Sequence, residues 1–419
     1  MAPEAELRVD PDRMLRDLRE LEELTGGADG AQRLAWTETW DSARAWLIAK
    51  LDEIGVGHSL DEAHNLWAES PGAGPVIAVG SHLDSVPNGG WLDGALGVIA
   101  GLEVLRAAVL DGWAEATLRL IDWADEEGAR FGYSTLGSSA AAGLLDPGEV
   151  RALTDASGQK LEEVLRGYGV ELDRMGESRS RLADLDALLE LHIEQGPVLE
   201  TAEVALGIPA GAVEVRRFMV AFDGQAAHAG TTPMKLRRDA GLAAARLCLD
   251  IKAIAEARGA LATCGSIQLT PGVATAVAER SETTVDLRST STAEMDELER
   301  QLREAVDRIA GQTSTSPRVS WLWSFPATSF DPELTEALTE AVSSIGPYET
   351  PVSGALHDAV AIARTPVPVA MLFVRSIGGI SHNKIEDSLD EDLEDGLRAF
   401  AGAVEILAEQ AGRRDPKSQ

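Results

Sequence analysis

One short stretch of the chain, VIAVGSHLDSVPNGGWLDGALGVIAG at 76–101, carries three side chains that can bind a metal ion or move a proton. They are His82, Asp84 and Asp93, and they follow an apolar β-branched run that predicts a buried strand. Small and apolar residues from Ala95 onward predict a helix packed closely on a sheet. Loops at the carboxyl ends of such strands usually carry the chemistry of α/β proteins. Imidazole with carboxylate suits zinc and its neighbours, and the alternative is that these residues only hydrogen-bond within the loop.

Two further apolar runs end in, or contain, reactive side chains. The run that begins at Thr117 ends in the acidic sequence DWADEE, 122–127, and the segment ELHIEQGP, 190–197, holds a histidine between apolar residues. Neighbouring side chains at the end of a strand point in different directions, so one acid can bind a metal while the next faces a substrate. Each segment also has an alternative interpretation. Acidic pairs are common on surfaces, and a single histidine in a strand is more often a hydrogen-bonded core residue.

Three later segments combine glycine with histidine: DGQAAHAGTTP at 223–233, SGALHDA at 353–359 and GISHN at 379–383. Chance placement does not favour such clustering in a chain with only seven histidines. The whole set therefore predicts a metal site more strongly than any single residue does. Five histidines fall within these motifs: His82, His192, His228, His357 and His382.

The predicted order of strands and helices, which must position these residues, changes along the chain. Strand-like runs alternate with helical segments up to about residue 212, which predicts a layered α/β domain. Strands and two helices, 233–256 and 293–309, then predict a compact domain of roughly a hundred residues with a small antiparallel sheet. After about residue 326, strand-like and helical segments alternate again as in the first part. The simplest interpretation is that the second domain is inserted into the first. The predicted boundaries are 1–212 and 326–412 for the interrupted domain, 213–325 for the inserted one, and 413–419 for a disordered tail.

The composition limits the classes of partner. The chain has 37 Lys and Arg against 69 Asp and Glu, a formal net charge of −32, which repels nucleic acids and anionic membranes. Its two cysteines, Cys248 and Cys264, make neither a disulfide framework nor a thiolate metal motif. The start MAPEAELRVDPDRM lacks the basic and apolar regions of a signal peptide, and no apolar run approaches a membrane span. We therefore predict a cytoplasmic protein without nucleic-acid or membrane partners, in which the charged, motif-free stretch 143–181 is a peripheral elaboration.

The ordered motifs resemble the hydantoinase/carbamoylase branch of the dinuclear-zinc aminoacylase and carboxypeptidase superfamily. They are SHLDSVPNGGWLDGALGV, DEEGARF, ELHIEQGPVLE, AAHAGTTPM with RRDA, VDLR, SGALHDA and GGISHNKIED, and they span about residues 76 to 390. The branch includes N-carbamoyl-L-amino acid hydrolases, allantoate amidohydrolases and β-ureidopropionases of the zinc type. The resemblance implies a two-domain α/β fold. A zinc-peptidase-like catalytic domain with a mixed sheet would be interrupted by an α+β, ferredoxin-like lid that forms the homodimer.

The resemblance also implies a centre of two divalent metal ions per subunit, with Asp93 as the bridging ligand. His82 and His192 would complete one site, and Glu127 and His382 the other. Zinc fits this ligand set, while manganese, cobalt and nickel fit sites of histidine and carboxylate almost as well. Two ions about 3.5–4 Å apart can share a water, lower its pKa and polarise the scissile carbonyl.

Three further residues gain roles in the chemistry through the resemblance. Glu126 would be the general base that takes the proton of the bridging water and passes it to the leaving nitrogen. Asp84 would hold the His82 ring and raise its basicity. His228, from the inserted domain, would reach across the homodimer to the partner's active site and stabilise the oxyanion.

Substrate contacts are implied for Gln195 and Arg288, which resemble the family's contacts to the polar end and the carboxylate of the substrate. Arginine suits a carboxylate because its planar fork makes two hydrogen bonds. The alternative for Arg288 is a surface ion pair at the end of a strand. Gly354 belongs to the same substrate-binding set, and His357 is predicted to be structural or substrate-facing rather than metal-binding.

Three positions depart from the family pattern. Thr275 replaces an asparagine before the VDLR strand, and Arg375 replaces a proline after the late FV strand. Leu356 replaces the second glycine of a GAGHDA-type turn, which would narrow the pocket or alter the approach of the backbone. These changes leave the metal chemistry intact and bear on the identity of the substrate.

The predicted activity is hydrolysis of a linear C–N amide or ureido bond by a metal-bridged hydroxide, with Glu126 as general base. The expected substrates are small molecules with a carboxylate, namely N-carbamoyl-L-amino acids, which would yield the amino acid, carbon dioxide and ammonia. Allantoate amidohydrolase is one alternative, and hydrolysis of N-acyl amino acids or small peptides is another. A binding protein that keeps the fold without turnover is disfavoured, because Glu126, Asp93 and the four other ligands are all present.

Overall fold

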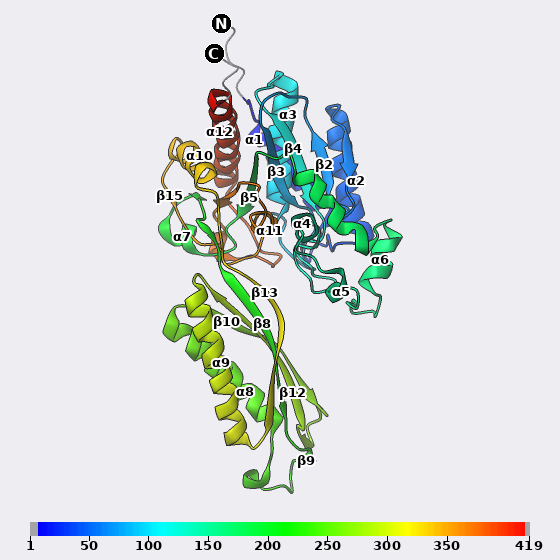
Figure 1. Ribbon diagram of the computed structural model, residues 1–419, viewed down its shortest axis with the longest axis vertical. Coiled ribbons are helices and arrows are strands. Elements are labelled where there is room, and N and C mark those ends of the chain that lie inside the picture. Colours follow the sequence, from blue (N-terminus) through cyan, green and yellow to red (C-terminus); the bar gives the residue numbers. More distant parts are fainter. Residues whose placement is uncertain (1–6, 415–419) are drawn as a thin grey trace. The chain divides into compact units, whose positions relative to one another are not determined.

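The computed structural model describes residues 7–414, and the chain forms two compact units, which Figure 1 colours along the sequence. The second unit is Ala212–Thr328, and the first unit consists of the chain on both sides of it. The sequence predicts an inserted domain at 213–325, close to this division. None of the helices in the described part of the chain is both long and apolar enough to cross a membrane.

The first unit is built on one mixed sheet of eight strands. In chain order they are β1 (His58–Leu60), β2 (Leu66–Glu69), β3 (Val76–His82), β4 (Thr117–Trp123), β5 (Ala187–Ile193), β6 (Leu206–Gly207), β15 (Tyr348–Glu349) and β16 (Val369–Val374). Their order across the sheet is β1-β2-β4-β3-β5-β16-β6-β15. The four central strands β4, β3, β5 and β16 run parallel, while β2 and β6 run antiparallel to their inner neighbours. Every residue of β5 is buried, as in a parallel strand covered on both faces.

Helices pack against this sheet and against one another. They are α1 (Pro11–Thr25), α2 (Glu38–Glu53), α3 (Ala95–Asp111), α4 (Leu136–Ala142), α5 (Pro147–Val150), α6 (Leu161–Gly167), α7 (Val198–Ala202), α10 (Pro332–Ser343), α11 (Asp358–Ile362), α12 (Asp390–Arg414) and the 3₁₀ helices η1 (Leu172–Leu182) and η3 (Ile377–Gly379). Helix α3 contacts β3, β4 and β5, α12 contacts β16 and β6, and α11 also reaches the central strands. Helices α1, α3 and α12 contact one another in the part of the unit seen in the upper half of Figure 1.

The predicted helix after the first motif is confirmed as α3, and its small residues explain its close approach to the sheet. A Cβ atom added at Gly97 would lie 2.3 Å from the carbonyl oxygen of Leu191. One added at Gly101 would lie 2.7 Å from Leu120 Cδ1. Glycine therefore lets the helix backbone lie directly on the strands, which fixes the loop between β3 and α3 against the end of the sheet.

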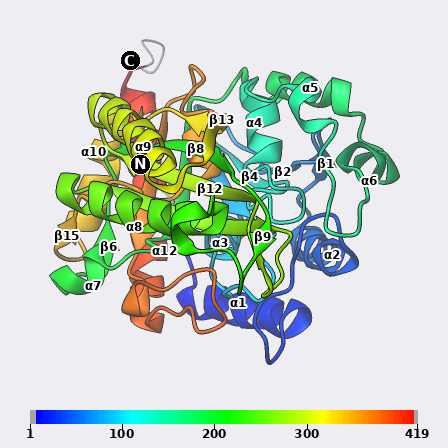
Figure 2. The ribbon, with the colours of Figure 1, turned by 90° about the horizontal axis from the view of Figure 1, so that it is seen from below.

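The second unit has the element order βαββαβ. Its main elements are β8 (Glu214–Asp223), α8 (Ala240–Arg258), β10 (Leu261–Thr270), β12 (Arg280–Ser289), α9 (Thr292–Thr313) and β13 (Ser316–Phe325), with the short strands β9 (Ala227–His228) and β11 (Ala276–Val277). The sheet order is β10-β12-β8-β13, and every pair is antiparallel. Helices α8 and α9 lie side by side along the sheet (Figures 1 and 2). This is a ferredoxin-like arrangement.

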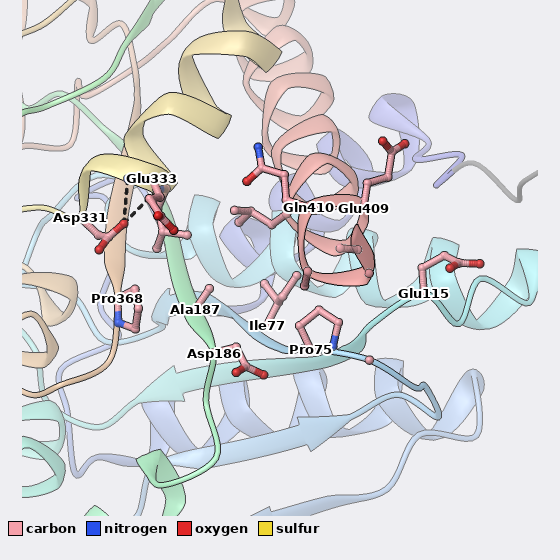
Figure 3. A pocket seen from close by; sticks show the side chains of 16 residues that line it. Pro75, Ile77, Glu115, Asp186, Ala187, Asp331, Glu333, Pro368, Glu409 and Gln410 are labelled. Carbon is pink, nitrogen blue, oxygen red and sulfur yellow. Dashed lines mark hydrogen bonds between the residues drawn. The ribbon is translucent and has the colours of Figure 1, made fainter. Parts of the chain in front are cut away.

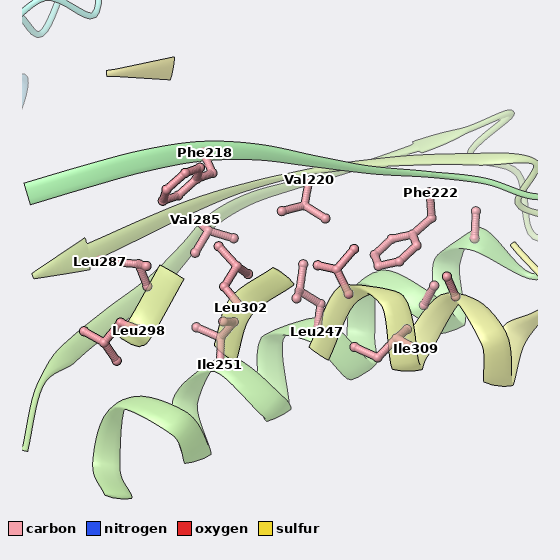
Figure 4. Packing of buried hydrophobic residues seen from close by; sticks show 14 of the residues in the cluster. Phe218, Val220, Phe222, Leu247, Ile251, Val285, Leu287, Leu298, Leu302 and Ile309 are labelled. Atoms are coloured by element: carbon pink, nitrogen blue, oxygen red, sulfur yellow. The ribbon is translucent and has the colours of Figure 1, made fainter. Parts of the chain in front are cut away.

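The core of the second unit lies between these two helices and one face of the sheet. Phe218 and Phe222 of β8 point toward Leu247 of α8 and Leu302 of α9, as Figure 4 shows. Buried and half-buried residues alternate along the whole of β12, as the two-residue period of a strand with one covered face requires. The unit thus has a hydrophobic core of its own.

Several predicted boundaries are wrong, and the helix predicted at 293–309 continues to Thr313 as α9. Helix α8 begins directly after Asp239 instead of at 233, because the Asp239 side chain accepts the N–H of Leu242 at 3.1 Å and caps the helix there. Helix α12 continues for two residues into the expected disordered tail, 413–419. The rest of that tail, 415–419, lies outside the described residues.

The stretch 143–181 is more than the predicted peripheral elaboration. Its apolar side chains form a hydrophobic cluster with Trp36 and Trp40 and with Ala124, which directly follows β4. Trp36 Nε1 also donates to Asp125 Oδ2 at 2.7 Å. The segment therefore supports the turn that carries the acidic motif. Its buried members in the cluster are Val150, Leu161, Leu165, Val170, Leu172 and Met175.

Candidate metal centre

The predicted metal-binding residues lie at the carboxyl ends of the four parallel strands. His82 is the last residue of β3 and pairs with Trp123 at the end of β4, so it belongs to the strand and not, as predicted, to the following loop. His192 lies in β5 opposite Phe373 of β16. The acidic motif follows β4, and the last histidine motif follows β16. Because parallel strands end at one edge of a sheet, four distant segments meet there.

Two sets of three donors share the carboxylate of Asp93. Asp93 Oδ1 lies 3.8 Å from His82 Nε2 and 3.3 Å from His192 Nε2. Asp93 Oδ2 lies 3.3 Å from His382 Nε2, which in turn lies 3.3 Å from Glu127 Oε2. The donor atoms of each set lie within 4.8 Å of one another. Since metal–ligand bonds to nitrogen and oxygen measure about 2.0–2.2 Å, each set can surround one ion.

Hydrogen bonds orient both buried imidazoles for metal binding. His82 Nδ1 lies 3.0 Å from the carbonyl oxygen of Asp84, and His192 Nδ1 lies 2.9 Å from that of Ile193. A carbonyl only accepts, so each Nδ1 carries a proton. Each Nε2 can then hold a second proton toward Asp93 or, in the neutral tautomer, offer a lone pair to an ion. The N–H of Gly94 approaches His192 Nε2 at 3.2 Å, as this tautomer requires. Both Nε2 atoms therefore face the shared carboxylate.

The carboxylate of Asp84 holds the acidic motif more closely than it holds the His82 ring. Its two oxygens accept the backbone N–H groups of Glu126 and Glu127, each at 3.1 Å. Its distance to His82 Nδ1 is 3.5 Å, longer than the contact that its own backbone carbonyl makes with that ring. The backbone carbonyl of Asp84 thus orients the His82 ring, which is the role predicted for the Asp84 side chain. The side chain instead holds the backbone of Glu126, the proposed base.

Electrostatics at the centre favour a bound cation. Burial raises the pKa of Glu126 well above its usual range and the pKa of Glu127 to about 8. Burial would also raise the pKa of Asp93, but hydrogen bonds from His192 and His382 hold it well below its usual range. The same contact with Asp93 raises the pKa of His382 to about 9. Protons thus offset the excess of carboxylate charge, and divalent ions that replace them fit this donor set.

Two of the predicted substrate-binding residues lie at the centre. Gln195 Nε2 donates to Asp93 Oδ2 at 2.8 Å. The His357 ring is buried, its centroid lies 4.5 Å from that of His192, and its Nε2 lies 3.1 Å from Ser353 Oγ. Burial lowers the pKa of His357 well below its usual range, so this ring is neutral.

Of the other predicted contact residues, Gly354 belongs to the first unit, and His228 and Arg288 belong to the second. Gly354 precedes α11, and a Cβ atom there would meet nothing within 4 Å, so the turn leaves open space. His228 lies in β9 of the second unit, where its exposed ring accepts the N–H of Gly230 at 3.1 Å. Arg288 lies in β12, where its Nε donates to Asp286 Oδ1 at 2.8 Å, the ion pair that the alternative interpretation expects. The roles of these residues toward a substrate stay predictions.

The buried charged residues beside the centre that were not predicted include Arg33 and Glu386. The Arg33 side chain is fully buried, and its Nε donates to the carbonyl oxygen of Leu83 at 2.7 Å. Glu386 is 2% exposed and accepts the N–H of Asp93 at 3.0 Å. Glu386 is part of the motif GGISHNKIED, which was a usable signal. Nothing in the residues around Arg33 indicates its position.

Two hollows in the first unit differ in their chemistry. One of about 980 Å³ lies where the central strands begin, next to Pro75, Asp186 and Pro368 (Figure 3). The described residues that line it include neither histidine nor cysteine, and one of its acids, Asp331, caps α10. A second hollow of about 460 Å³ is lined in part by His382, at the opposite ends of the strands. Because His382 lines it, the second hollow is the better candidate for a substrate.

Comparison with known proteins agrees with this geometry. Residues 78–406 match the peptidase family M20/M25/M40. An N-carbamoyl-L-amino-acid amidohydrolase of Paenarthrobacter aurescens is 33% identical over 407 residues, 96% of this chain and 98% of that protein. An allantoate amidohydrolase of Escherichia coli is 32% identical over 391 residues, 91% and 94% of the two chains. The crystal structure of a hydantoinase/carbamoylase family amidase from Burkholderia multivorans has a TM-score of 0.81 at 33% identity and covers 95% of this chain and 97% of its own. The chain therefore belongs to peptidase family M20/M25/M40 and, within it, to the hydantoinase/carbamoylase branch.

Proposed function

We propose that this chain is a metal-dependent amidohydrolase that cleaves a linear ureido C–N bond in N-carbamoyl-L-amino acids. The observation that carries the proposal is Asp93, whose two oxygens serve separate donor sets beside the buried Glu126. The carbamoylases among its relatives suggest the substrate class. Water and the carbamoyl compound would give the free amino acid, carbon dioxide and ammonia.

The residues at the centre divide the work of hydrolysis. When bound, two divalent ions would lower the pKa of a shared water and polarise the scissile carbonyl. Glu126, whose Oε2 lies 3.7 Å from His82 Nε2, would take the proton of the attacking water and deliver it to the leaving nitrogen. Burial raises the pKa of Glu126, so this carboxylate holds a proton more readily than an ordinary glutamate, as a base that later returns the proton requires. Asp84 would keep the base in place through the backbone of Glu126 and Glu127.

The proposed ligands are His82, Asp93 and His192 for one ion and Asp93, Glu127 and His382 for the other. Mixed imidazole and carboxylate donors suit zinc, and manganese, cobalt and nickel bind similar sets. Metal content of the purified protein, measured by mass spectrometry before and after treatment with a chelator, would give both the number of ions and their identity.

Substrate binding would draw on both units. Arg288 would bind the substrate carboxylate through its planar fork, and Gln195 would contact the polar end. Gly354 and His357 would line the same pocket, where the glycine leaves space and the neutral ring can donate or accept a hydrogen bond. In a homodimer, His228 would be donated across the interface to stabilise the oxyanion of the partner's site.

The shared site is testable by mixing two inactive proteins. Both His228→Ala and Glu126→Gln homodimers should turn over slowly. A mixed dimer should regain activity, because one of its two sites would have both an intact base and an intact donor. Subunit exchange would first be demonstrated, for example with differently tagged chains. If activity then fails to recover, His228 does not act across the interface.

A second candidate is allantoate amidohydrolase, because an enzyme of that name is similar to this chain over nearly its whole length. Allantoate also carries a carboxylate and ureido groups, so the same centre can serve either substrate. The positions that depart from the family pattern, Thr275, Leu356 and Arg375, are the ones at which we expect the choice between them to be made.

Ammonia release from the metal-loaded protein tests the proposal. The panel would contain N-carbamoyl-L-amino acids with small, aromatic and sulfur-bearing side chains, N-carbamoyl-β-alanine and allantoate. It would also contain a few N-acyl amino acids and dipeptides, for which release of free amine would be measured. Turnover of carbamoyl amino acids that a chelator abolishes and metal restores is the expected result. Turnover of allantoate alone would select the second candidate. Release of amine from N-acyl amino acids or dipeptides, with no ureido turnover, would refute both assignments.

A further inference from the structure

One buried side chain joins the loop after β16 to the loop after β3. Glu386 is 2% exposed, and its Oε1 accepts the N–H of Leu92 at 3.2 Å and the N–H of Asp93 at 3.0 Å. The acceptor and these donors are 294 and 293 residues apart in the chain. The bond therefore connects the peptide of the shared metal donor with the loop that carries His382.

The second oxygen of this carboxylate controls a hydroxyl at the centre. Glu386 Oε2 lies 2.7 Å from Ser381 Oγ, which lies 3.0 Å from Asp93 Oδ2. Gln195 Nε2 donates to both Ser381 Oγ, at 3.1 Å, and Asp93 Oδ2, at 2.8 Å. A hydroxyl has one proton, and the shorter contact assigns it to Glu386. The Ser381 proton is thus held away from the Asp93 oxygen that faces His382.

The chain makes room for this carboxylate and supplies a counter-charge. A Cβ atom at Gly90 would lie 2.0 Å from Glu386 Cδ and Oε1, so only glycine lets the carboxylate reach the backbone here. Arg33 is fully buried, and Glu386 is the acid whose charge acts on it most strongly. One terminal nitrogen of Arg33 has no hydrogen-bond partner among the described residues. A buried carboxylate beside Asp93 would be costly without such a cation.

We propose that Glu386 is a positioning residue of the metal centre. It fixes the backbone of Asp93 to the His382 loop and directs the Ser381 proton away from the Asp93 oxygen of the second donor set. The inference rests on the two-ion centre proposed above. Loss of the carboxylate should therefore lower the affinity for the ion held by Asp93, Glu127 and His382 more than the affinity for the ion held by the first donor set.

The test is Glu386→Gln in the full chain. The glutamine carbonyl can still accept the backbone N–H groups, but its amide must donate to Ser381 Oγ, which turns the hydroxyl proton toward Asp93. We expect the second equivalent of Zn²⁺ to bind about 10–100-fold more weakly, with the first little changed, in competition titrations against a chromogenic chelator. Adding Ser381→Ala removes that proton and should restore part of the lost affinity.

A matched control is Glu103→Gln in α3. Glu103 is also a buried carboxylate, but its partners are the N–H of Asp10 and the side chains of Arg13 and Arg106, away from the donors. This variant should lower the unfolding temperature of the metal-free protein and leave both zinc affinities unchanged.

The outcomes separate the inference from the proposed function. If the wild type binds two zinc ions and hydrolyses its substrate while Glu386→Gln binds both ions with unchanged affinity, the positioning role is refuted and the function stands. If Glu386→Gln lowers both zinc affinities equally and the double variant recovers neither, the role of Glu386 is merely structural. That result would also refute the positioning role. A wild type that binds fewer than two ions would refute the two-ion centre, and this inference with it.

Discussion

Gly94→Ala tests whether the backbone at the start of α3 sets the position of the His82 ring. Gly94 has a φ of 66°, and a Cβ atom there would lie 2.4 Å from His82 Cε1 and Nδ1 and 2.5 Å from Nε2. An ordinary contact begins near 3.4 Å, so the ring must move by about 1 Å or rotate. Misplacement of a catalytic group by about 1 Å can cost about 100-fold in rate. We therefore expect turnover to fall about 100-fold and zinc content to drop from two ions to one.

Gly112→Ala is the control, because this glycine ends the same helix and also has a positive φ. Its φ is 68°, and a Cβ atom there would meet nothing within 4 Å. The left-handed conformation costs an alanine about 1–2 kcal/mol. Gly112→Ala should lose about that much unfolding free energy. Gly94 has a ψ of −43°, outside the left-handed helical region, so Gly94→Ala should lose more, and only this variant should also lose metal and activity.

The assays are urea unfolding in the presence of a chelator, zinc content after dialysis, and ammonia release. Loss of metal and activity in Gly94→Ala but not in Gly112→Ala would separate the contact with the ring from a general loss of stability. If Gly94→Ala retains both ions and turns over within a few-fold of Gly112→Ala, the ring does not depend on this glycine and the argument fails.

Three further predictions concern single side chains. Glu126→Gln should keep both metal ions and lose at least about 100-fold in turnover, and a variant with wild-type turnover would exclude Glu126 as the base. Burial and the charge of Arg44 lower the pKa of His64 to about 4, so the folded chain resists a proton that the unfolded chain accepts near pH 6.5. Stability that is present above pH 6.5 should be lost as the pH falls toward 4, by at most about 3 kcal/mol, and urea unfolding of the metal-free His64→Asn variant should lack this loss. Arg44→Met should cost about 3–5 kcal/mol in the same assay, because it leaves buried Asp122 without the guanidinium that it meets at 2.7 Å, and Asp122→Asn in the same chain should recover part of that cost.

The features that could be predicted are those in which pattern and position are local. The apolar runs of β3, β4 and β5 stand next to their reactive residues in the sequence, so the strand ends and their histidines are visible without a structure. The switch to βαββαβ order similarly shows the inserted unit. The prediction that His82 lies in a loop is wrong, because the sequence does not distinguish a polar residue at the end of a strand from one in the loop that follows.

The features that could not be predicted depend on contacts between distant segments. The bond between Glu386 and the Asp93 backbone joins residues 293 positions apart, which no spacing rule reveals. Arg33 is buried through a contact with Leu83, and its own neighbours look like an ordinary loop. The carboxylate of Asp84 binds backbone N–H groups, which every residue has, so its partners could not be identified from side-chain type.

The place of the insertion determines when each donor becomes available during synthesis. The donors of the first set all precede residue 212, whereas His382, like the β16 strand that pairs beside His192, follows the whole second unit. A ribosome that adds about 5–20 residues per second needs roughly 10–40 s to pass from His192 to His382. During that interval the nascent chain contains four of the five proposed donors but lacks His382. The donor set of Asp93, Glu127 and His382 is therefore completed late in synthesis. Its completion requires the strands from both parts of the interrupted domain to have come together.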